Sequence, residues 1–268
     1  MKKFDMTRFG RVLKLDFAEG LKPMMWGALA MLLLYLFFFW FAHNIAYHGS
    51  WYQNHPENMV RNICDSVGQF GCVAMMFFFL ITASILYRAE QKKQQRIAWL
   101  MLPATNPEKF VSRWIYMLVF SLVGGILSFV VADGIHIAWL MVNGMPVMDA
   151  TSYFFNGLPH TSEYVSLLEI TSIYGMMIVI HSFFLLGGVL FKKYHFIVTS
   201  ALMVLTLAVL FSLYNALGLY QQSTVSSDVT AFYTTMIVLE TGVIALFTWL
   251  AYRLFCRWQV ITRKFVNL

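Results

Sequence analysis

The chain has 268 residues, of which 59% are hydrophobic and only 12% are charged. Soluble domains carry about 25% charged residues, so the composition excludes an ordinary soluble protein and predicts a polytopic membrane protein. The net charge of +6 comes from basic residues at the ends of apolar runs, where such residues set orientation and contact lipid headgroups. We therefore expect contact with membrane lipid and no nucleic-acid partner.

Residues 1–23 are predicted to form an amphipathic helix. One face of the helical wheel is apolar and consists of Met6, Phe9, Val12, Leu13 and Phe17. The other face carries Arg8, Arg11, Lys14 and Glu19, and Asp16 and Leu15 are exceptions to the pattern. Such a helix lies in the plane of the headgroups. Pro23 is then expected to provide the corner into the bilayer.

Six apolar runs follow, each long enough to cross a hydrocarbon core about 30 Å thick, which takes about 20 helical residues. They are residues 24–46, 66–87, 114–132 (which could extend to Leu140), 167–190, 196–219 and 232–252. We expect an all-α fold with an amphipathic elbow helix, a six-span transmembrane domain over residues 24–252 and a basic tail over residues 253–268.

Basic residues alternate between the two sides of this predicted topology. Residues 1–23 and 88–113 each contain six Lys or Arg residues, the turn at Lys192 and Lys193 contains two, and the tail contains four. Only Arg61 falls on the other side. By the positive-inside rule, both termini and residues 88–113 are cytoplasmic.

The charged segment 88–113 interrupts the apolar runs, and its basic residues are Arg88, Lys92, Lys93, Arg96, Lys109 and Arg113. Pro103 should end its first helix. Thr105 or Asn106 can cap the next helix, with Glu108 placed to complete a Thr-x-x-Glu capping box. The pattern predicts a broken helix leading into the third span, which we interpret as a cytoplasmic docking segment.

Small residues recur in two of the predicted spans. Ser121, Gly124, Gly125 and Ser128 form overlapping small-x-x-x-small patterns in the third span, and the fourth contains Gly187 and Gly188. These patterns are typical of close helix packing.

Glu240 and His181 are ionisable residues inside predicted spans, and such residues often mark functional sites. They could line a translocation path or relay protons, or each could hydrogen-bond to a neighbouring span. The sequence favours the structural interpretation for His181 and leaves Glu240 open.

Asp133 and His136 lie three residues apart at the outer end of the third span, where we expect a solvated helix end rather than a metal site or proton-linked pair. The spacing of His43, His48 and His55 near the first outer loop matches no set of metal ligands.

The order of these parts resembles the membrane subunit, or permease, of a type-2 ABC transporter, over nearly the whole chain. The local signature is Leu-Pro-Ala-Thr-Asn-Pro-Glu-Lys-Phe at residues 102–110, followed by Arg113. It is similar to the Leu-Pro-small-x-x-x-Glu-Lys-Phe stretch before the third span in bacterial permeases of this type, particularly those of the Bacteroides group.

The resemblance implies a subunit of the bacterial inner membrane that acts with a second permease, identical or paralogous, and exports an amphipathic or lipid-like compound. It implies that cytoplasmic P-loop ATPase subunits hydrolyse ATP, since this chain has no Gly-x-x-x-x-Gly-Lys-Ser/Thr motif and is expected to be neither an enzyme nor a cofactor-binding subunit. Residues 91–102 would be the coupling helix. The implied docking residues are Arg88, Lys92, Lys93, Arg96, Trp99, Pro103, Glu108, Lys109 and Arg113.

Two other classes of function fit the same sequence. A non-transporting scaffold or regulatory subunit would use the basic segment to bind another cytoplasmic protein. A proton-coupled secondary carrier would use Glu240 and His181. An intramembrane enzyme has the least support, because no set of residues has catalytic spacing.

Overall fold

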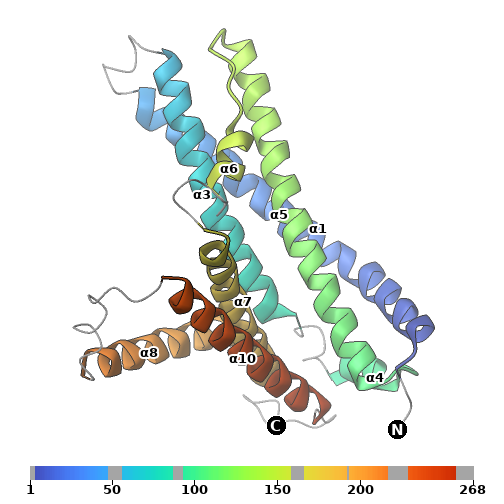
Figure 1. Ribbon diagram of the computed structural model, residues 1–268. Helices are drawn as coiled ribbons and strands as arrows, with labels where there is room; N and C mark the ends of the chain where they lie inside the picture. Colours follow the sequence, from blue (N-terminus) through green and yellow to red (C-terminus); the bar gives the residue numbers. More distant parts are fainter. Residues whose placement is uncertain are drawn as a thin grey trace. The chain divides into compact units, whose positions relative to one another are not determined.

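The computed structural model describes residues 4–47, 56–86, 93–157, 166–191, 193–216 and 229–257. The fold over these residues is all-helical (Figure 1), as predicted. The helices are α1 (Met6–Tyr47), α3 (Pro56–Ile85), α4 (Lys93–Met101), α5 (Asn106–Val142), α6 (Ala150–Gly157), α7 (Leu167–Leu190), α8 (His195–Ala216) and α10 (Val229–Cys256).

The chain divides into two compact units. The α7 unit comprises Met1–Val12, Leu80–Trp114 and Thr161–Leu268, and the α6 unit comprises Leu13–Phe79 and Ile115–His160. In the α7 unit, α7 packs against α10 and against α8. In the α6 unit, α1, α3, α5 and α6 share one apolar core.

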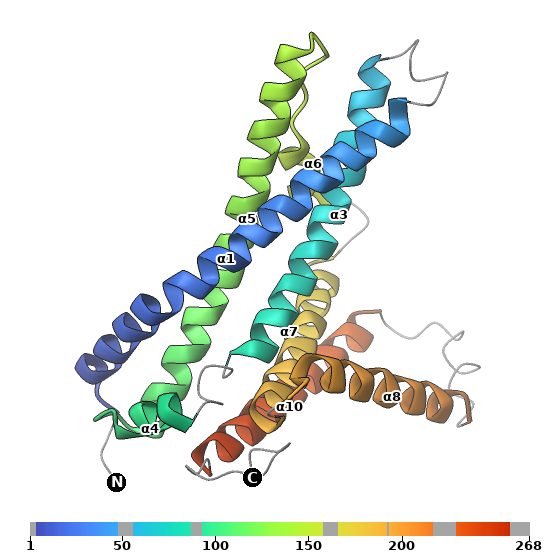
Figure 2. The same ribbon diagram turned by 180° about the vertical axis from the view of Figure 1, so that it is seen from behind.

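Five helices, α1, α3, α5, α7 and α10, are long and apolar enough to cross a membrane. The chain therefore has the make-up of a multi-pass membrane protein. The predicted span at residues 196–219 corresponds to α8, whose described apolar stretch, His195–Val209, is shorter than the five. In both views α8 runs across α7 rather than alongside it (Figure 1 and Figure 2), so six spans remain a prediction.

The separate elbow helix expected at residues 1–23 is not seen. Instead α1 continues from Met6 to Tyr47 with Pro23 inside it. A proline removes one backbone hydrogen bond, whereas ending the helix would leave four N–H and four C=O groups unpaired. In an apolar environment every unpaired backbone group is costly, so continuing the helix is the less expensive solution.

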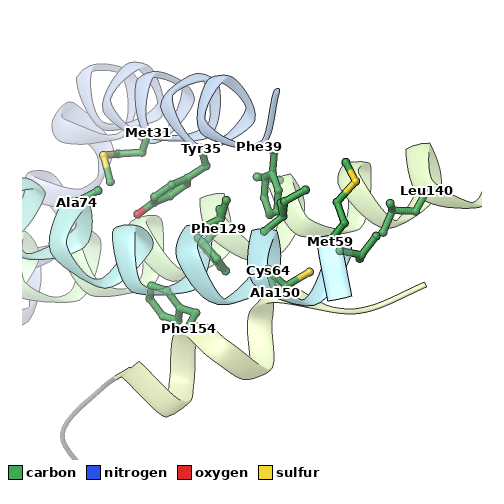
Figure 3. Packing of buried hydrophobic residues seen from close by; sticks show 14 of the residues in the cluster. Met31, Tyr35, Phe39, Met59, Cys64, Ala74, Phe129, Leu140, Ala150 and Phe154 are labelled. Carbon is green, nitrogen blue, oxygen red and sulfur yellow. The ribbon is translucent and has the colours of Figure 1, made fainter. Parts of the chain in front are cut away.

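Aromatic side chains from three helices fill the core of the α6 unit (Figure 3). Phe129 of α5 stacks on Phe154 of α6, with ring centroids 4.5 Å apart, and meets Tyr35 of α1 edge-on at 5.1 Å. The short helix α6 comes close to α3 at Gly68, where an added Cβ would lie 2.8 Å from the backbone nitrogen of Phe154. Glycine thus lets α6 pack into the unit.

The small residues of the third and fourth predicted spans do permit close packing, as expected. Ser128 on α5 donates a hydrogen bond to the carbonyl oxygen of Ala28 on α1, at 2.9 Å. A Cβ on Gly188 of α7 would lie 2.5 Å from the carbonyl oxygen of Ser84, at the end of α3. The first contact lies within the α6 unit and the second lies within the α7 unit.

Candidate functional site

The predicted docking segment folds as a short helix followed by a new long one. Helix α4 ends at Met101, two residues before Pro103, and α5 begins at Asn106. The backbone N–H of Thr105 donates to Oε2 of Glu108 at 2.8 Å, which is the contact expected of the glutamate in a capping box. The predicted break in the helix is confirmed.

Glu108 also joins the start of α5 to the N-terminal residues. Its Oε1 accepts hydrogen bonds from the backbone N–H of Asp5, at 2.8 Å, and from Nη2 of Arg8, at 2.9 Å. The Glu108 side chain is completely buried, and hydrogen bonds between charged groups are stronger than neutral ones. Glu108 therefore holds the N-terminal residues against the start of α5 within the α7 unit.

Lys109 and Arg113 hold α4 against α5. Nζ of Lys109 donates to the carbonyl oxygens of Trp99, at 2.9 Å, and Leu100, at 3.2 Å, in the last turn of α4, where a cation is favourable. The guanidinium of Arg113 lies 5.0 Å from the centroid of the Trp99 ring. Trp99 in turn meets Phe255 of α10 edge-on at 5.7 Å.

We call Trp99, Glu108, Lys109 and Arg113 the α4 junction. All four side chains are buried, so they shape the predicted docking segment from within and do not face a partner. Among the side chains of α4 that the structure describes, Gln94, Ala98, Leu100 and Met101 are exposed. Of these, Gln94, Ala98 and Met101 have the spacing of one helix face.

Of the other predicted docking residues, the structure describes the side chain of only Pro103. Pro103 is exposed in the turn between α4 and α5. Arg88 and Lys92 lie outside the described residues, and so do the side chains of Lys93 and Arg96. Asp5 and Arg8 were not predicted from the sequence, because no local pattern links them to Glu108, about 100 positions away.

Glu240 and His181 do not form one site. Glu240, buried on α10, accepts a hydrogen bond from the hydroxyl of Ser172 on α7 at 2.9 Å. A Cβ at Gly175 would collide with the second oxygen of this carboxylate. His181 is also buried but lies nine residues beyond Ser172, about 13 Å further along α7.

A second group of polar side chains lies in the α6 unit. Asp133 on α5 accepts hydrogen bonds from the backbone N–H groups of Ala150, at 3.0 Å, and Thr151, at 2.8 Å, and from the Thr151 hydroxyl, at 2.6 Å. The carboxylate thus satisfies the unpaired N–H groups at the start of α6. Asp133 is buried, so the expected solvated helix end is wrong; α6 folds back and covers it.

Two histidines extend this group. Nδ1 of His136 lies 3.6 Å from Oδ1 of Asp133, and Nε2 of His136 lies 3.0 Å from Nε2 of His43 on α1. We call His43 and His136 the histidine pair, and both rings are buried. No group of three His, Cys, Asp or Glu side chains in the described part of the chain could hold a metal ion.

The two groups differ in how they arise. The α4 junction is built around a capping pattern that is visible in the sequence, whereas the two residues of the histidine pair are 93 positions apart and lie on different helices.

A scan against protein-family models and searches among curated proteins and solved structures found no match to this chain.

Proposed function

We propose that the protein is the permease subunit of an ABC transporter, with α4 as its coupling helix. A separate cytoplasmic ATPase would hydrolyse ATP, and the permease would export an amphipathic or lipid-like compound together with a second permease, identical or paralogous. The observation that carries the proposal is the construction of α4. One face of α4 packs against the rest of the α7 unit through the α4 junction. Met101, on the opposite face, is 78% exposed and could contact a partner.

The junction would pass a movement of α4 to three other segments. Lys109 and Arg113 connect α4 to the start of α5, Phe255 connects it to the end of α10, and Glu108 connects the start of α5 to the N-terminal residues. A rigid short helix with these attachments suits a domain-closure switch with two states.

Contacts within the α7 unit support the proposed topology, in which both termini lie on the cytoplasmic side of the inner membrane. The N-terminal residues, α4, the start of α5 and the end of α10 meet at the junction. Oγ of Ser84, at the end of α3, also lies 3.0 Å from Nδ1 of His195, at the start of α8. All of these segments are cytoplasmic by the positive-inside rule.

The direction of α10 supports α8 as the sixth span. Ser172 on α7 bonds Glu240 on α10, and further along both helices the ring of Phe183 lies 5.5 Å from that of Phe247. Residue numbers rise together, so α7 and α10 are parallel, and the chain between them must return across the membrane. With 22 residues, α8 is about 33 Å long, which is enough to cross.

The test is to purify the tagged full-length protein gently from its native membrane and to identify its stoichiometric partners by mass spectrometry. We expect a P-loop ATPase with the wild-type protein. Met101→Asp, on the exposed face of α4, should remove the ATPase because it places a charge in the docking surface. Val142→Asp is the matched control, since Val142 is 86% exposed at the other end of α5, and should retain it.

A folded complex that contains no ATPase would overturn the proposal and favour the scaffold. Retention of the ATPase by Met101→Asp would remove α4 from the docking role.

A proton-coupled carrier is the second candidate, and the observation that favours it is the environment of Glu240. This buried carboxyl has one described hydrogen-bond donor, Ser172, and its Oε2 has no described partner. In proteoliposomes without any ATPase, a carrier would take up protons driven by an imposed gradient, as seen with a pH-sensitive dye. Glu240→Gln should abolish that uptake, and absence of uptake in the wild-type protein would exclude the carrier.

A further inference from the structure

A pocket of about 670 Å³ opens between α1 and α5, entirely within the α6 unit. Its volume falls within the range of about 300–1,000 Å³ typical of small-molecule sites. Phe39 of α1 stacks on His136 of α5, with ring centroids 4.1 Å apart. One turn later on both helices, the rings of His43 and Trp139 are 4.6 Å apart. Residue numbers rise together, so α1 and α5 are parallel here and each forms one wall of the pocket.

The two walls carry the same order of side chains. Each has an aliphatic residue, a tryptophan and an asparagine at intervals of four residues, which places the three on one helix face. They are Leu36, Trp40 and Asn44 on α1 and Ile135, Trp139 and Asn143 on α5. Eight helical residues rise about 12 Å. The pocket therefore has an aliphatic end and, about 12 Å away, an amide end where α1 and α5 finish.

The rings between these ends are open to a ligand. Trp40 is 61% exposed and Trp139 is 44% exposed, although both line the pocket. Two indoles on facing walls offer a large apolar surface to a hydrocarbon chain.

The two asparagines are held in the same way. Nδ2 of Asn44 donates to the carbonyl oxygen of Trp40 at 2.9 Å, and Nδ2 of Asn143 donates to that of Trp139 at 2.7 Å. Both side chains are exposed. Because each amide nitrogen is turned toward its own helix, each amide oxygen remains an acceptor for a donor from outside the helix. The amide end thus favours a headgroup that donates hydrogen bonds.

The lining also favours a ligand without charge. None of the described residues that line the pocket is a lysine, arginine, aspartate or glutamate, so a charged headgroup would lose part of its hydration without gaining a counter-ion. In the histidine pair one nitrogen of the 3.0 Å contact must accept, so at least one of the two rings is neutral. A hydroxyl group is a neutral donor and suits both conditions.

We propose that this pocket binds an uncharged amphipathic molecule with one hydrocarbon chain and a hydroxylated headgroup, as in a monoacylglycerol. The hydroxyl groups donate to the amide oxygens of Asn44 and Asn143, and the chain runs past Trp40 and Trp139 toward the aliphatic end. The inference concerns the α6 unit alone and does not rest on the role of α4.

The test uses a monoacylglycerol that carries a photoreactive diazirine in its chain, added to the full-length protein in nanodiscs of phosphatidylcholine. After illumination, mass spectrometry of peptides locates the label. We expect saturable labelling around Trp40 and Trp139, because the chain lies between these two rings.

Unlabelled competitors with the same chain then identify the headgroup. They are the monoacylglycerol, the methyl ester, which has no hydroxyl group, and the alkylamine, which is protonated at pH 7 because its pKa is about 10. We expect the monoacylglycerol to displace the label at a concentration about tenfold lower than either of the others, since it alone makes two neutral hydrogen bonds.

Variants of the pocket identify the contacts. Asn44→Leu and Asn143→Leu remove the amide and keep the size of the side chain, so each should weaken competition by the monoacylglycerol about fivefold and leave the methyl ester unchanged. Asn62→Leu is the matched control, because Asn62 is an exposed asparagine on α3 that does not line the pocket. Ile135→Trp should fill the aliphatic end and abolish saturable labelling.

Equal competition by the monoacylglycerol and the methyl ester would overturn the proposal, and so would stronger competition by the amine. Unchanged competition in both asparagine variants would overturn it too. If these variants do not fold, the three competitors on the wild-type protein decide alone. No ATPase takes part in this assay, so its failure would leave the proposal for α4 standing.

Discussion

Asp133 in the α6 unit and Glu240 in the α7 unit are both buried carboxyl groups on apolar helices, yet they differ in the number of hydrogen-bond donors around them. Asp133 receives three hydrogen bonds from the first turn of α6, whereas Glu240 receives one from the residues that the structure describes, donated by Ser172. Among the described residues, the fold therefore supplies more donors to the Asp133 carboxylate than to the Glu240 carboxyl.

The sequence singles out Glu240 as a candidate functional residue, whereas the structure shows more contacts for Asp133. Glu240 attracts attention because it lies deep in an apolar run, and Asp133 does not because it lies near the predicted end of one. Only the folded position of α6 shows that Asp133 is buried and that it orients the histidine pair.

The largest effect should come from Asp133→Ala. It leaves the N-terminus of α6 without its acceptors and His136 without its anion, so we expect a loss of about 3–5 kcal/mol in the free energy of unfolding. Denaturation in detergent measures it. Asp149→Ala removes the acceptor of the backbone N–H and the hydroxyl of Ser152 in the same turn and should cost about 1 kcal/mol. Equal losses would contradict the role of Asp133.

Glu108→Ala should come second, at about 2–4 kcal/mol, because it leaves two backbone N–H groups and Arg8 without their shared carboxylate. Membrane insertion should be intact, and ATPase co-purification should fall. Glu57→Ala is the control, since Glu57 is an exposed glutamate in the first turn of α3. Full ATPase recovery with Glu108→Ala would separate the α4 junction from docking.

Glu240→Gln should change the free energy of unfolding by less than about 1 kcal/mol, because the amide oxygen can still accept the Ser172 hydrogen bond. The same denaturation experiment measures it, with Ser172→Ala as the companion variant. A loss as large as that of Asp133→Ala would show that Glu240 is structural too and would remove the basis for the carrier.

The smallest effect on stability should come from Pro103→Ala, below about 0.5 kcal/mol, because Pro103 is exposed. Alanine would allow α4 to extend beyond Met101 and would change its angle, so ATPase co-purification should decrease. Unaltered co-purification would show that the turn does not set the angle of α4.

Local chemistry explains what the sequence predicted well. The end of α4 before Pro103 and the cap formed by Glu108 depend on residues within three or four positions of each other. Of the six apolar runs predicted to span the membrane, five are found as membrane-length helices in the described part of the chain. The separate elbow helix before Pro23 is not confirmed, since Pro23 lies inside α1. A local pattern does not include the cost of two new helix ends in an apolar environment.

The sequence by itself therefore determined the all-helical, membrane-length elements and the break between α4 and α5, since these follow from periodicity and capping. The tertiary structure alone decided the partners of the buried polar groups. Asp5 and Glu108 are 103 residues apart, and His43 and His136 are 93 apart. No pattern of neighbouring residues encodes such pairs, because they form only when packed helices bring distant side chains together and exclude water from them.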